Sequence, residues 1–350
     1  MKCVELVGPK KLEVKSRVAP TSKDGSVVFR VNTCGICGSD IHYWDMGAPV
    51  GLVMGHEFCG TVIDPGARGD LKVGDRITGL PISPCGKCDA CKHGNPQYCK
   101  ETWSHAVGLS LDYSGGYAEV SACHPNMVRK LPDIISNEEA CMVEPSAVSL
   151  HAVNLANVKV GDKVCIIGGG IIGLMAAEFA KMNGASYVCM VEANRNRGKK
   201  SLTYGYVDEY FNALNKDTIP NLVAMTNGFD VVIEACGNSA AVSEAMMLVK
   251  NGGMIVLVGV SMAPISVPMI MPVMGEVSMK GAIGYKEEEF DDVIELLRLR
   301  KLDVVKYIDD IIPIEAANSA FERLTNMDND AIKISCNIVM TFSFSKYNVL

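Results

Sequence analysis

Two short segments in the first half of the chain carry side chains that are typical ligands of a transition metal. The candidate catalytic residues in these segments are Cys37, Ser39, His42, His56 and Glu57. A thiolate, an imidazole and a carboxylate can hold Zn²⁺ and leave one position open for a substrate. Zinc at such an open site lowers the pKa of a substrate alcohol, so that the alkoxide can lose a hydride. The residues alone leave two alternatives open: a redox pair of Cys34 with Cys37, and a histidine that is simply packed in the core.

Four more cysteines lie close together further along the chain, at Cys85, Cys88, Cys91 and Cys99. A segment this short cannot bury a core of its own, and four thiolates around one tetrahedral Zn²⁺ would fold it. Such a site is closed, so it would be structural rather than catalytic. An iron–sulfur cluster and a pair of disulfides are the alternatives, although the fourth cysteine is followed by Lys100 rather than by the proline usual for a cluster.

A glycine-rich turn at residues 168–173 has the spacing G-x-G-x-x-G. It follows an expected strand and opens an expected helix, which is the context of a dinucleotide-binding turn. The first glycine makes the tight turn, the second lets the backbone approach a pyrophosphate, and the third lets helix and strand pack closely. The candidate cofactor residues in this turn are Gly168, Gly170, Ile172 and Gly173.

An acidic residue, Glu192, ends the next expected strand about 20 residues further on. A carboxylate at this place accepts hydrogen bonds from the ribose hydroxyls and repels a 2′-phosphate, so it favours NAD over NADP. The basic residues that follow, with Arg197 as the candidate cofactor contact, argue in the other direction. A glycine-rich turn with an incidental surface glutamate is the alternative interpretation.

The elements that must position these residues change character near residue 160. The first 145 residues or so predict short strands between Gly- and Pro-rich turns. Beyond them, apolar strands alternate with helices, which predicts a parallel sheet covered on both faces. The expected strands are 1–7, 27–32, 60–64, 163–167, 187–191, 230–234 and 254–260, and the expected helices are 171–182 and 293–299, with short strands in the tail.

Length and composition describe a globular protein of two domains. The 350 residues are 48% hydrophobic and carry a net charge of −7 with no long run of either sign, so neither a nucleic-acid partner nor a membrane partner is expected. The most apolar stretch, residues 254–274, is interrupted by Pro264, Pro268 and Pro272, and we expect a strand and then a loop rather than a membrane span. The start shows no secretory signal. The fourteen cysteines are therefore expected in the reducing cytoplasm, as metal ligands or buried thiols.

Taken together, these segments resemble the zinc-containing medium-chain dehydrogenase/reductase family over nearly the whole chain. Residues 55–60, Gly-His-Glu-x-x-Gly, with Gly66 six positions further, resemble the family's zinc signature. Residues 74–77 resemble its Gly-Asp turn, and residues 115–119 resemble the segment that usually follows the cysteine lobe. The cysteine lobe and the glycine turn come in the family's order.

The resemblance implies an α/β fold of two domains. A GroES-like β-rich catalytic domain would comprise residues 1–147 and 286–350, with the structural zinc lobe at 84–100. A Rossmann domain with a doubly wound parallel sheet would comprise residues 148–285 and bind NAD. The active site would lie in the cleft between the two domains. Relatives of this kind form homodimers or homotetramers, so the same is expected here.

Carried over residue by residue, the resemblance makes Cys37 and His56 ligands of the catalytic zinc. Glu57 becomes a direct or a nearby ligand. Glu144, which precedes a proline, takes the third protein-ligand position, where many alcohol dehydrogenases have cysteine and the polyol and butanediol branches have glutamate.

The resemblance also assigns the proton path. Ser39 would take the proton of the alcohol, and the cofactor ribose and His42 would pass it to solvent. Asp40 would orient its neighbours rather than take part in the chemistry. Cys34 would pack near the site without binding metal.

The substrate implied by the resemblance is a small alcohol or its ketone. Residues 37–44 resemble sorbitol dehydrogenases, so Tyr43 and Trp44 are the candidate pocket residues, with ordinary packing as the alternative. Those enzymes usually carry an arginine where this chain has Gly284, and residues 144–153 look closer to butanediol dehydrogenases. The expected activity is hydride transfer between NAD and a secondary alcohol of a polyol or vicinal diol. The alternatives are an L-threonine 3-dehydrogenase, an aminocyclitol or sugar-phosphate dehydrogenase, a metal-free quinone-reductase-type enzyme and a non-catalytic binding protein.

Overall fold

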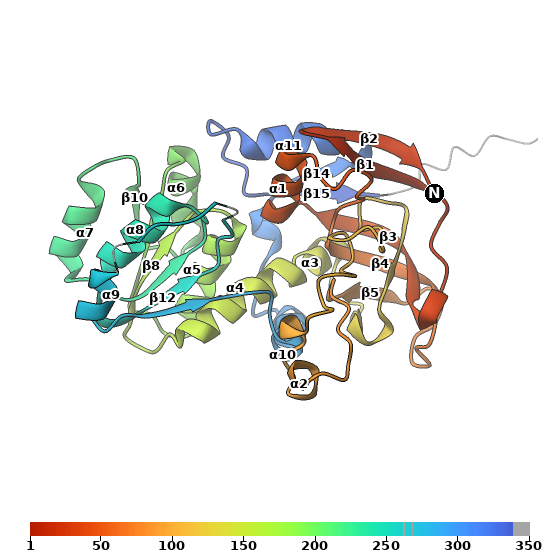
Figure 1. The fold of residues 1–350 in the computed structure, drawn as a ribbon, viewed down its shortest axis with the longest axis horizontal. Coiled ribbons are helices and arrows are strands. Elements are labelled where there is room, and N and C mark those ends of the chain that lie inside the picture. Colours follow the sequence, from red (N-terminus) through yellow and green to blue (C-terminus); the bar gives the residue numbers. More distant parts are fainter. Residues whose placement is uncertain (262, 268, 339–350) are drawn as a thin grey trace, which may run out of the picture.

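The computed structural model describes residues 1–261, 263–267 and 269–338. Two large β-sheets lie side by side in these residues, and the helix α4 (Val143–Ala156) runs between them (Figure 1). The chain enters the right-hand sheet first, builds the left-hand sheet from its middle third, and returns to the right-hand sheet at its end. Both ends of the described chain therefore contribute to one unit, as expected for a GroES-like domain with a Rossmann domain inserted.

The right-hand sheet is mixed, and its strands lie in the order β14-β15-β3-β4-β5-β7, with β6 also paired to β3. Its strands are β3 (Val27–Gly35), β4 (Glu57–Asp64), β5 (Arg76–Gly79), β6 (Val120–Cys123), β7 (Val128–Lys130), β14 (Ile308–Pro313) and β15 (Lys333–Asn337). A separate hairpin joins β1 (Lys2–Gly8) to β2 (Lys11–Ser16). The associated helices are α1 (Gly38–Met46), α2 (Asp89–Lys92), α3 (Asn137–Cys141), α10 (Glu287–Arg298) and α11 (Ala317–Thr325). The C-terminal strand β15 pairs antiparallel with β3, so the last described strand lies beside the segment that leads to Cys37.

The left-hand sheet is parallel throughout the described strands, in the order β10-β9-β8-β11-β12-β13. Its strands are β8 (Lys163–Ile167), β9 (Tyr187–Glu192), β10 (Glu209–Asn212), β11 (Phe229–Glu234), β12 (Val249–Leu257) and β13 (Ser278–Gly281). Its helices are α5 (Ile171–Met182), α6 (Arg195–Ser201), α7 (Thr218–Thr226), α8 (Ser239–Leu248) and α9 (Ile270–Met274). The strand order reverses between β8 and β11, and ligands of such sheets bind at the carboxyl ends of the strands on either side of this reversal.

Alternation along the central strands explains how both faces of the parallel sheet are covered. Val164 and Ile166 on β8 belong to the core under α4 and α5, whereas Cys165 and Ile167 belong to the core under α7 and α8. Successive side chains of a strand point to opposite faces, so a continuous apolar run fills both. α4 is tied to α5 because the Ser149 hydroxyl donates to the carbonyl of Ile172 at 3.1 Å.

The expected strand at 163–167 and helix at 171–182 agree with β8 and α5, but the catalytic half is more helical than expected. The structure adds α1, α3 and α11, and α10 begins six residues before the expected 293. α10 starts earlier because the Glu289 carboxylate accepts the backbone N–H of Lys286, the N-cap residue, at 2.9 Å. The predicted domain boundary between residues 147 and 148 falls inside α4.

The apolar stretch at 254–274 begins with a strand, as expected. The prediction that the rest of it is a loop is wrong for its last residues. Residues 270–274 form α9, which contains Pro272 in its first turn. Proline is tolerated there because the first N–H groups of a helix have no intrahelical partner. Met262 and Pro268 lie outside the described residues. No helix of the described chain is long and apolar enough to cross a membrane.

A buried polar cluster joins α4 to α10. The Glu289 carboxylate lies 2.7 Å from His151 Nδ1 and accepts hydrogen bonds from the Asn154 amide at 2.9 Å and from the Lys286 N–H at 2.9 Å. Burial by itself raises the pKa of Glu289, but the hydrogen bonds from His151 and Asn154 outweigh burial and lower it. The ionised carboxylate therefore stabilises the packing of these two helices.

Glu289→Gln is expected to lower the free energy of unfolding at pH 7 by about 2 kcal/mol, because it weakens hydrogen bonds to a buried charge. A carboxyl group with a lowered folded-state pKa stabilises the protein above its ordinary pKa, and this contribution is lost as the pH falls through the folded-state value. The difference between variant and wild type should therefore narrow below about pH 4. Chemical denaturation of variant and wild type at pH 7 and again below about pH 4 measures this difference in the free energy of unfolding.

The matched control is Glu288→Gln, which removes an exposed carboxylate from the same turn of α10. Its effect should stay within about 0.5 kcal/mol. A Glu289→Gln deficit that is equally large at both pH values would show that lost packing, rather than the charge, causes it.

Candidate active site

Cys37 lies where β3 gives way to α1. It occupies the N-cap position of α1, and its backbone N–H donates to the Asp40 carboxylate at 3.1 Å. The same carboxylate oxygen accepts the Tyr117 hydroxyl at 2.8 Å, and Asp40 is fully buried. Asp40 therefore fixes the start of the helix and the direction of the thiol, which is the orienting role predicted for it.

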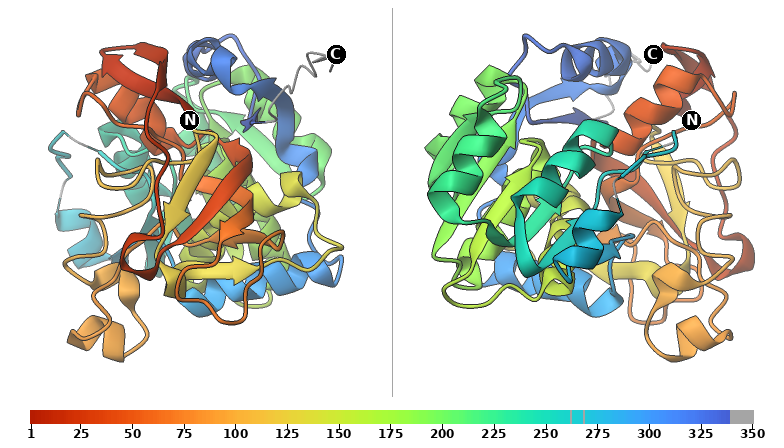
Figure 2. Two further views of the ribbon diagram at one scale, coloured as in Figure 1. Left: turned by 90° about the vertical axis from the view of Figure 1, so that its right-hand side faces the viewer. Right: turned by 60° about the vertical axis from the view of Figure 1, so that its left-hand side comes forward.

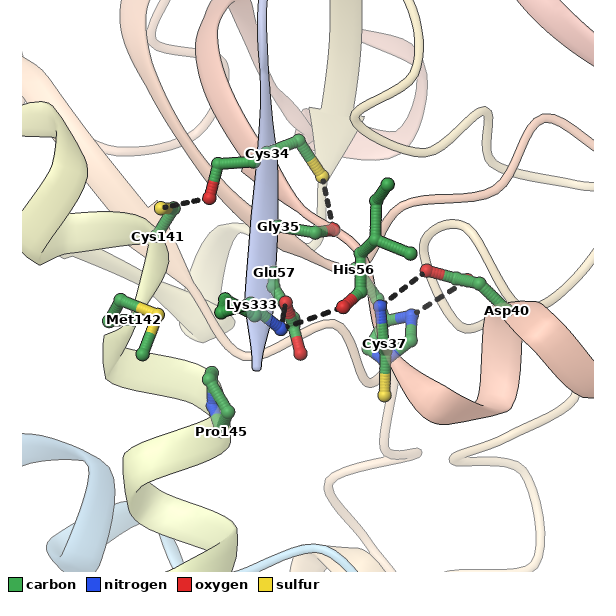
Figure 3. A network of polar contacts seen from close by, with 12 residues as sticks. Cys34, Gly35, Cys37, Asp40, His56, Glu57, Cys141, Met142, Pro145 and Lys333 are labelled. Atoms are coloured by element: carbon green, nitrogen blue, oxygen red, sulfur yellow. Dashed lines mark hydrogen bonds and ion pairs between the residues drawn. The ribbon is translucent and has the colours of Figure 1, made fainter. Parts of the chain in front are cut away.

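His56 faces Cys37 from the residue before β4 (Figure 3). Its Nδ1 lies 3.5 Å from the Asp40 carboxylate, and its Nε2 lies 3.4 Å from the Ser39 hydroxyl. The Ser39 hydroxyl also lies 3.3 Å from the Cys37 sulfur. Burial alone would lower the pKa of His56, but the Cys37 thiolate and the Asp40 carboxylate outweigh burial and raise it well above its ordinary value. The Cys37 sulfur and the Asp40 carboxylate therefore favour a positive charge at this position.

Glu57 is held by a residue that the sequence analysis missed. The Lys333 ammonium, on β15, forms a fully buried ion pair with one oxygen of Glu57 (Figure 3) and donates to the carbonyl of Ile36 at 2.9 Å. Burial lowers the pKa of Lys333, but the Glu57 carboxylate outweighs burial and raises it. One clue to this buried role was present in the sequence: Lys333 lies within the otherwise uncharged stretch 331–336.

These side chains form a donor set that fits zinc. One donor atom each of Cys37, His56 and Glu57 lies within 4.8 Å of the other two. The second carboxylate oxygen of Glu57 is buried and has no hydrogen-bond partner among the described residues. Cys34 does not belong to the group, because its buried sulfur contacts the carbonyl of Gly35 instead.

A cavity of about 490 Å³ opens in front of this donor set. Its lining includes Ser39, His42, Tyr43 and Glu144, together with Ile172 from the glycine turn and Cys236 from the loop after β11. The cavity therefore joins the donor set to the point where the parallel sheet reverses its strand order. Glu144, at the first turn of α4, is 9% exposed, and burial raises its pKa to about 7. Its carboxylate lies outside the three-residue donor group.

One of the predicted site residues, Trp44, is placed elsewhere by the structure. Trp44 does not line the cavity, because it is buried in the core, tilted against Phe321, with its N–H donated to Asn318 at 3.1 Å. On α1, it is the neighbouring Tyr43 that reaches the cavity instead. Arg197, expected at the cofactor, donates to the carbonyl of Leu324 at 2.9 Å and so ties α6 to the C-terminal part of the chain.

The four cysteines at 85–99 come together in a lobe that projects from the bottom of both views in Figure 2. Their four sulfur atoms lie within 4.8 Å of one another. Burial raises the pKa of Cys99, but backbone N–H groups, that of Cys85 first, outweigh burial and lower it to about 6. A thiolate at neutral pH is the form that binds zinc. His93 is exposed and stays outside the group.

The glycine turn has the shape that a dinucleotide requires. A Cβ at Gly173 would lie 1.9 Å from the carbonyl oxygen of Gly168, whereas a Cβ at Gly170 would meet no atom within 4 Å. Helix and strand thus pack closely at Gly173, and the surface stays open for a pyrophosphate at the start of α5. The Glu192 carboxylate lies beside the turn, where it accepts the N–H of Gly169 at 2.5 Å.

Comparison with known proteins agrees with this geometry. The family model of the alcohol dehydrogenase GroES-like domain matches residues 23–133, and that of the zinc-binding dehydrogenases matches residues 172–298. A zinc-type alcohol dehydrogenase-like protein of Escherichia coli is 31% identical over 93% of this chain and 95% of its own. The sorbitol dehydrogenase of Bacillus subtilis is 28% identical over 95% and 96%.

Among solved structures, 2R,3R-butanediol dehydrogenase from Bacillus subtilis superimposes with a TM-score of 0.84 at 27% identity, covering 97% of this chain and 99% of the other. The similarity covers nearly the full length of both chains. The chain is therefore an oxidoreductase that belongs to the zinc-containing medium-chain dehydrogenase/reductase family.

Proposed function

We propose that the protein transfers a hydride between NAD and a secondary alcohol of a polyol or vicinal diol, with the help of a catalytic zinc ion. One observation carries the proposal: the donor set of Cys37, His56 and Glu57 opens into the same cavity as Ile172 of the glycine turn. A metal site and a nicotinamide site that share one cavity can bring an alcohol carbon next to a hydride acceptor.

The residues that would hold the catalytic zinc are Cys37, His56 and Glu144, with Glu57 as the neighbouring carboxylate. Lys333 pairs with Glu57, which favours Glu144 as the third ligand. Bound zinc would supply a Lewis acid that makes the substrate hydroxyl more acidic.

The proton path runs through side chains of α1. Ser39, whose hydroxyl lies within 3.4 Å of both Cys37 and His56, accepts the proton of the alcohol. The proton would then pass through the cofactor ribose to His42. His42 lines the cavity and is exposed, so it can release the proton to solvent. Asp40 holds His56 in place and takes no proton itself.

The second zinc would be structural and bound by Cys85, Cys88, Cys91 and Cys99. These thiols must stay reduced to bind it, which supports a location in the cytoplasm. Glu192, beside the glycine turn, favours NAD because it can accept hydrogen bonds from ribose hydroxyls and repels a 2′-phosphate. We assign residues 148–285 to the cofactor domain and residues 1–147 and 286–350 to the catalytic domain.

We also propose a homodimer or homotetramer. Among the described strands, β13 is an edge of the parallel sheet, and its four residues are exposed. The neighbouring α9 exposes Ile270, Val273 and Met274. Exposed edge strands and apolar patches of this kind are normally covered by a partner, and a second copy of the chain would cover both.

Removal of zinc tests the proposed function. Purified protein is assayed with a panel of polyols, diols and L-threonine, with NAD and with NADP, before and after a chelator and again after zinc is restored. Activity should follow bound zinc and prefer NAD. A demonstrably zinc-free protein that still turned over would remove the metal from the mechanism.

A further inference from the structure

We propose that the substrate is an uncharged secondary alcohol with short alkyl substituents and few additional hydroxyls, and that Trp103 and Gly284 form the wall that selects it. This inference rests on the proposed function and narrows its substrate class.

The charge of the cavity lining argues against an anionic substrate. Among the described lining residues none is lysine or arginine, and the buried carboxylates Glu57 and Glu144 already face this space. Lys333, close to the site, is fully buried and already forms an ion pair with Glu57. A phosphate or carboxylate on the substrate would lose its hydration without gaining the charged hydrogen bonds that normally replace it.

The polar side chains of the lining argue against a substrate with many hydroxyls. Apart from the metal donors, Ser39 and His42 serve the proton path, which leaves the Tyr43 hydroxyl and the Cys236 thiol. The apolar part of the described lining includes Met46, Pro81, Trp103, Leu109 and Ile283. Hydroxyls of a sugar alcohol that face such a wall would stay without partners, which costs binding energy.

Trp103 and Gly284 make this wall apolar by their mutual packing. A Cβ on Gly284 would lie 3.4 Å from an edge carbon of the Trp103 indole, so the edge of the ring lies next to the glycine. Gly284 has a φ of +55°, in the left-handed region that side chains rarely adopt. A long polar side chain at 284 would therefore strain the backbone and displace the indole.

The polar atom of Trp103 does not serve the substrate either. The indole N–H donates to the carbonyl of Gln97 at 3.3 Å, so the ring presents carbon to the cavity. A flat apolar surface of this kind fits an alkyl group next to the reacting carbon.

A series of four-carbon substrates tests the inference at constant chain length. 2-Butanol, 2,3-butanediol, erythritol and 3-hydroxybutyrate add hydroxyls or a carboxylate to one skeleton. We expect kcat/KM for erythritol and for 3-hydroxybutyrate to be lower than for 2,3-butanediol by roughly 10- to 100-fold or more, the range for a group added inside an apolar pocket. Equal or better use of erythritol or 3-hydroxybutyrate would overturn the inference while leaving the proposed function intact.

Variants at Trp103 test the role of the wall. Trp103→Gln should narrow the ratio of kcat/KM between 2,3-butanediol and erythritol at least tenfold, whereas Trp103→Phe should preserve it because the wall stays apolar. An unchanged ratio in Trp103→Gln would refute the assignment of this residue.

Fluorescence gives a readout that needs no turnover. The chain has two tryptophans, so in Trp44→Phe the emission comes from Trp103 alone. We expect 2,3-butanediol to change this emission in a saturable way and erythritol to change it less. If no member of the four-carbon series is a substrate but a longer polyol of the wider panel is, the inference is refuted and the proposed function stands. If no alcohol of the wider panel shows zinc-dependent activity, the proposed function is refuted as well.

Discussion

Cys37→Ser is expected to lower kcat/KM for a secondary alcohol on the order of 1,000-fold and to reduce the zinc content from two ions per chain to one. A serine hydroxyl is a poor zinc ligand, and Cys37 is the one thiolate in the donor set of Cys37, His56 and Glu57. The Lewis acid supplies several kcal/mol of transition-state stabilisation, and each 1.4 kcal/mol or so corresponds to a factor of ten in rate. Elemental analysis and steady-state kinetics on the same preparation measure the two effects.

Two other cysteines provide matched controls for this loss. Cys34→Ser changes a buried thiol three residues away that contacts a backbone carbonyl, so it should keep both zinc ions and most of the activity. Cys88→Ser should also lose one zinc ion, but its cost should appear as a lower melting temperature rather than as a lower kcat of the folded fraction. A Cys37→Ser protein with two zinc ions and normal kcat would refute the assigned catalytic site.

Lys333→Met is expected to lower the free energy of unfolding by about 3–5 kcal/mol, because it leaves the buried Glu57 carboxylate without its partner. Lys333 and Glu57 are both almost completely inaccessible to solvent, so water cannot replace the lost ion pair. The measurement is chemical denaturation of the zinc-loaded protein at pH 7.

The double variant Lys333→Met with Glu57→Gln separates charge from packing. If the unpaired carboxylate causes the damage, the double variant should recover most of the lost stability. Lys130→Met is the matched control, since Lys130 pairs with Asp75 at the surface and exposed pairs contribute less than about 1 kcal/mol. A loss in Lys333→Met as small as that of the control would mean that the pair contributes little to the fold.

Local sequence carried enough information to predict the Rossmann part of the fold. The strand at 163–167, the glycine turn and the helix at 171–182 depend on residues that are adjacent in the chain, and the structure agrees with them. The same holds for the cysteine lobe, where spacing alone placed four thiols near each other. Short-range patterns of this kind are set by turn geometry and ligand chemistry.

The predictions that failed depended on contacts with distant segments. Trp44 looked like a pocket residue, but Asn318, from the far end of the chain, holds it in the core. Lys333 was overlooked because its partner, Glu57, is 276 residues away, and no local pattern reveals such a pairing.

The helix α4 sets the spacing between Glu144 and the glycine turn. Glu144 lies at its first turn, and Ser149, further along the same helix, is bonded to Ile172 at the glycine turn. Each residue of an α-helix advances about 1.5 Å and turns about 100°. One residue inserted between Glu144 and Ser149 would swing the carboxylate a quarter-turn or more away from its present heading. The length of this helical segment thus fixes how the Glu144 carboxylate is placed relative to the glycine turn.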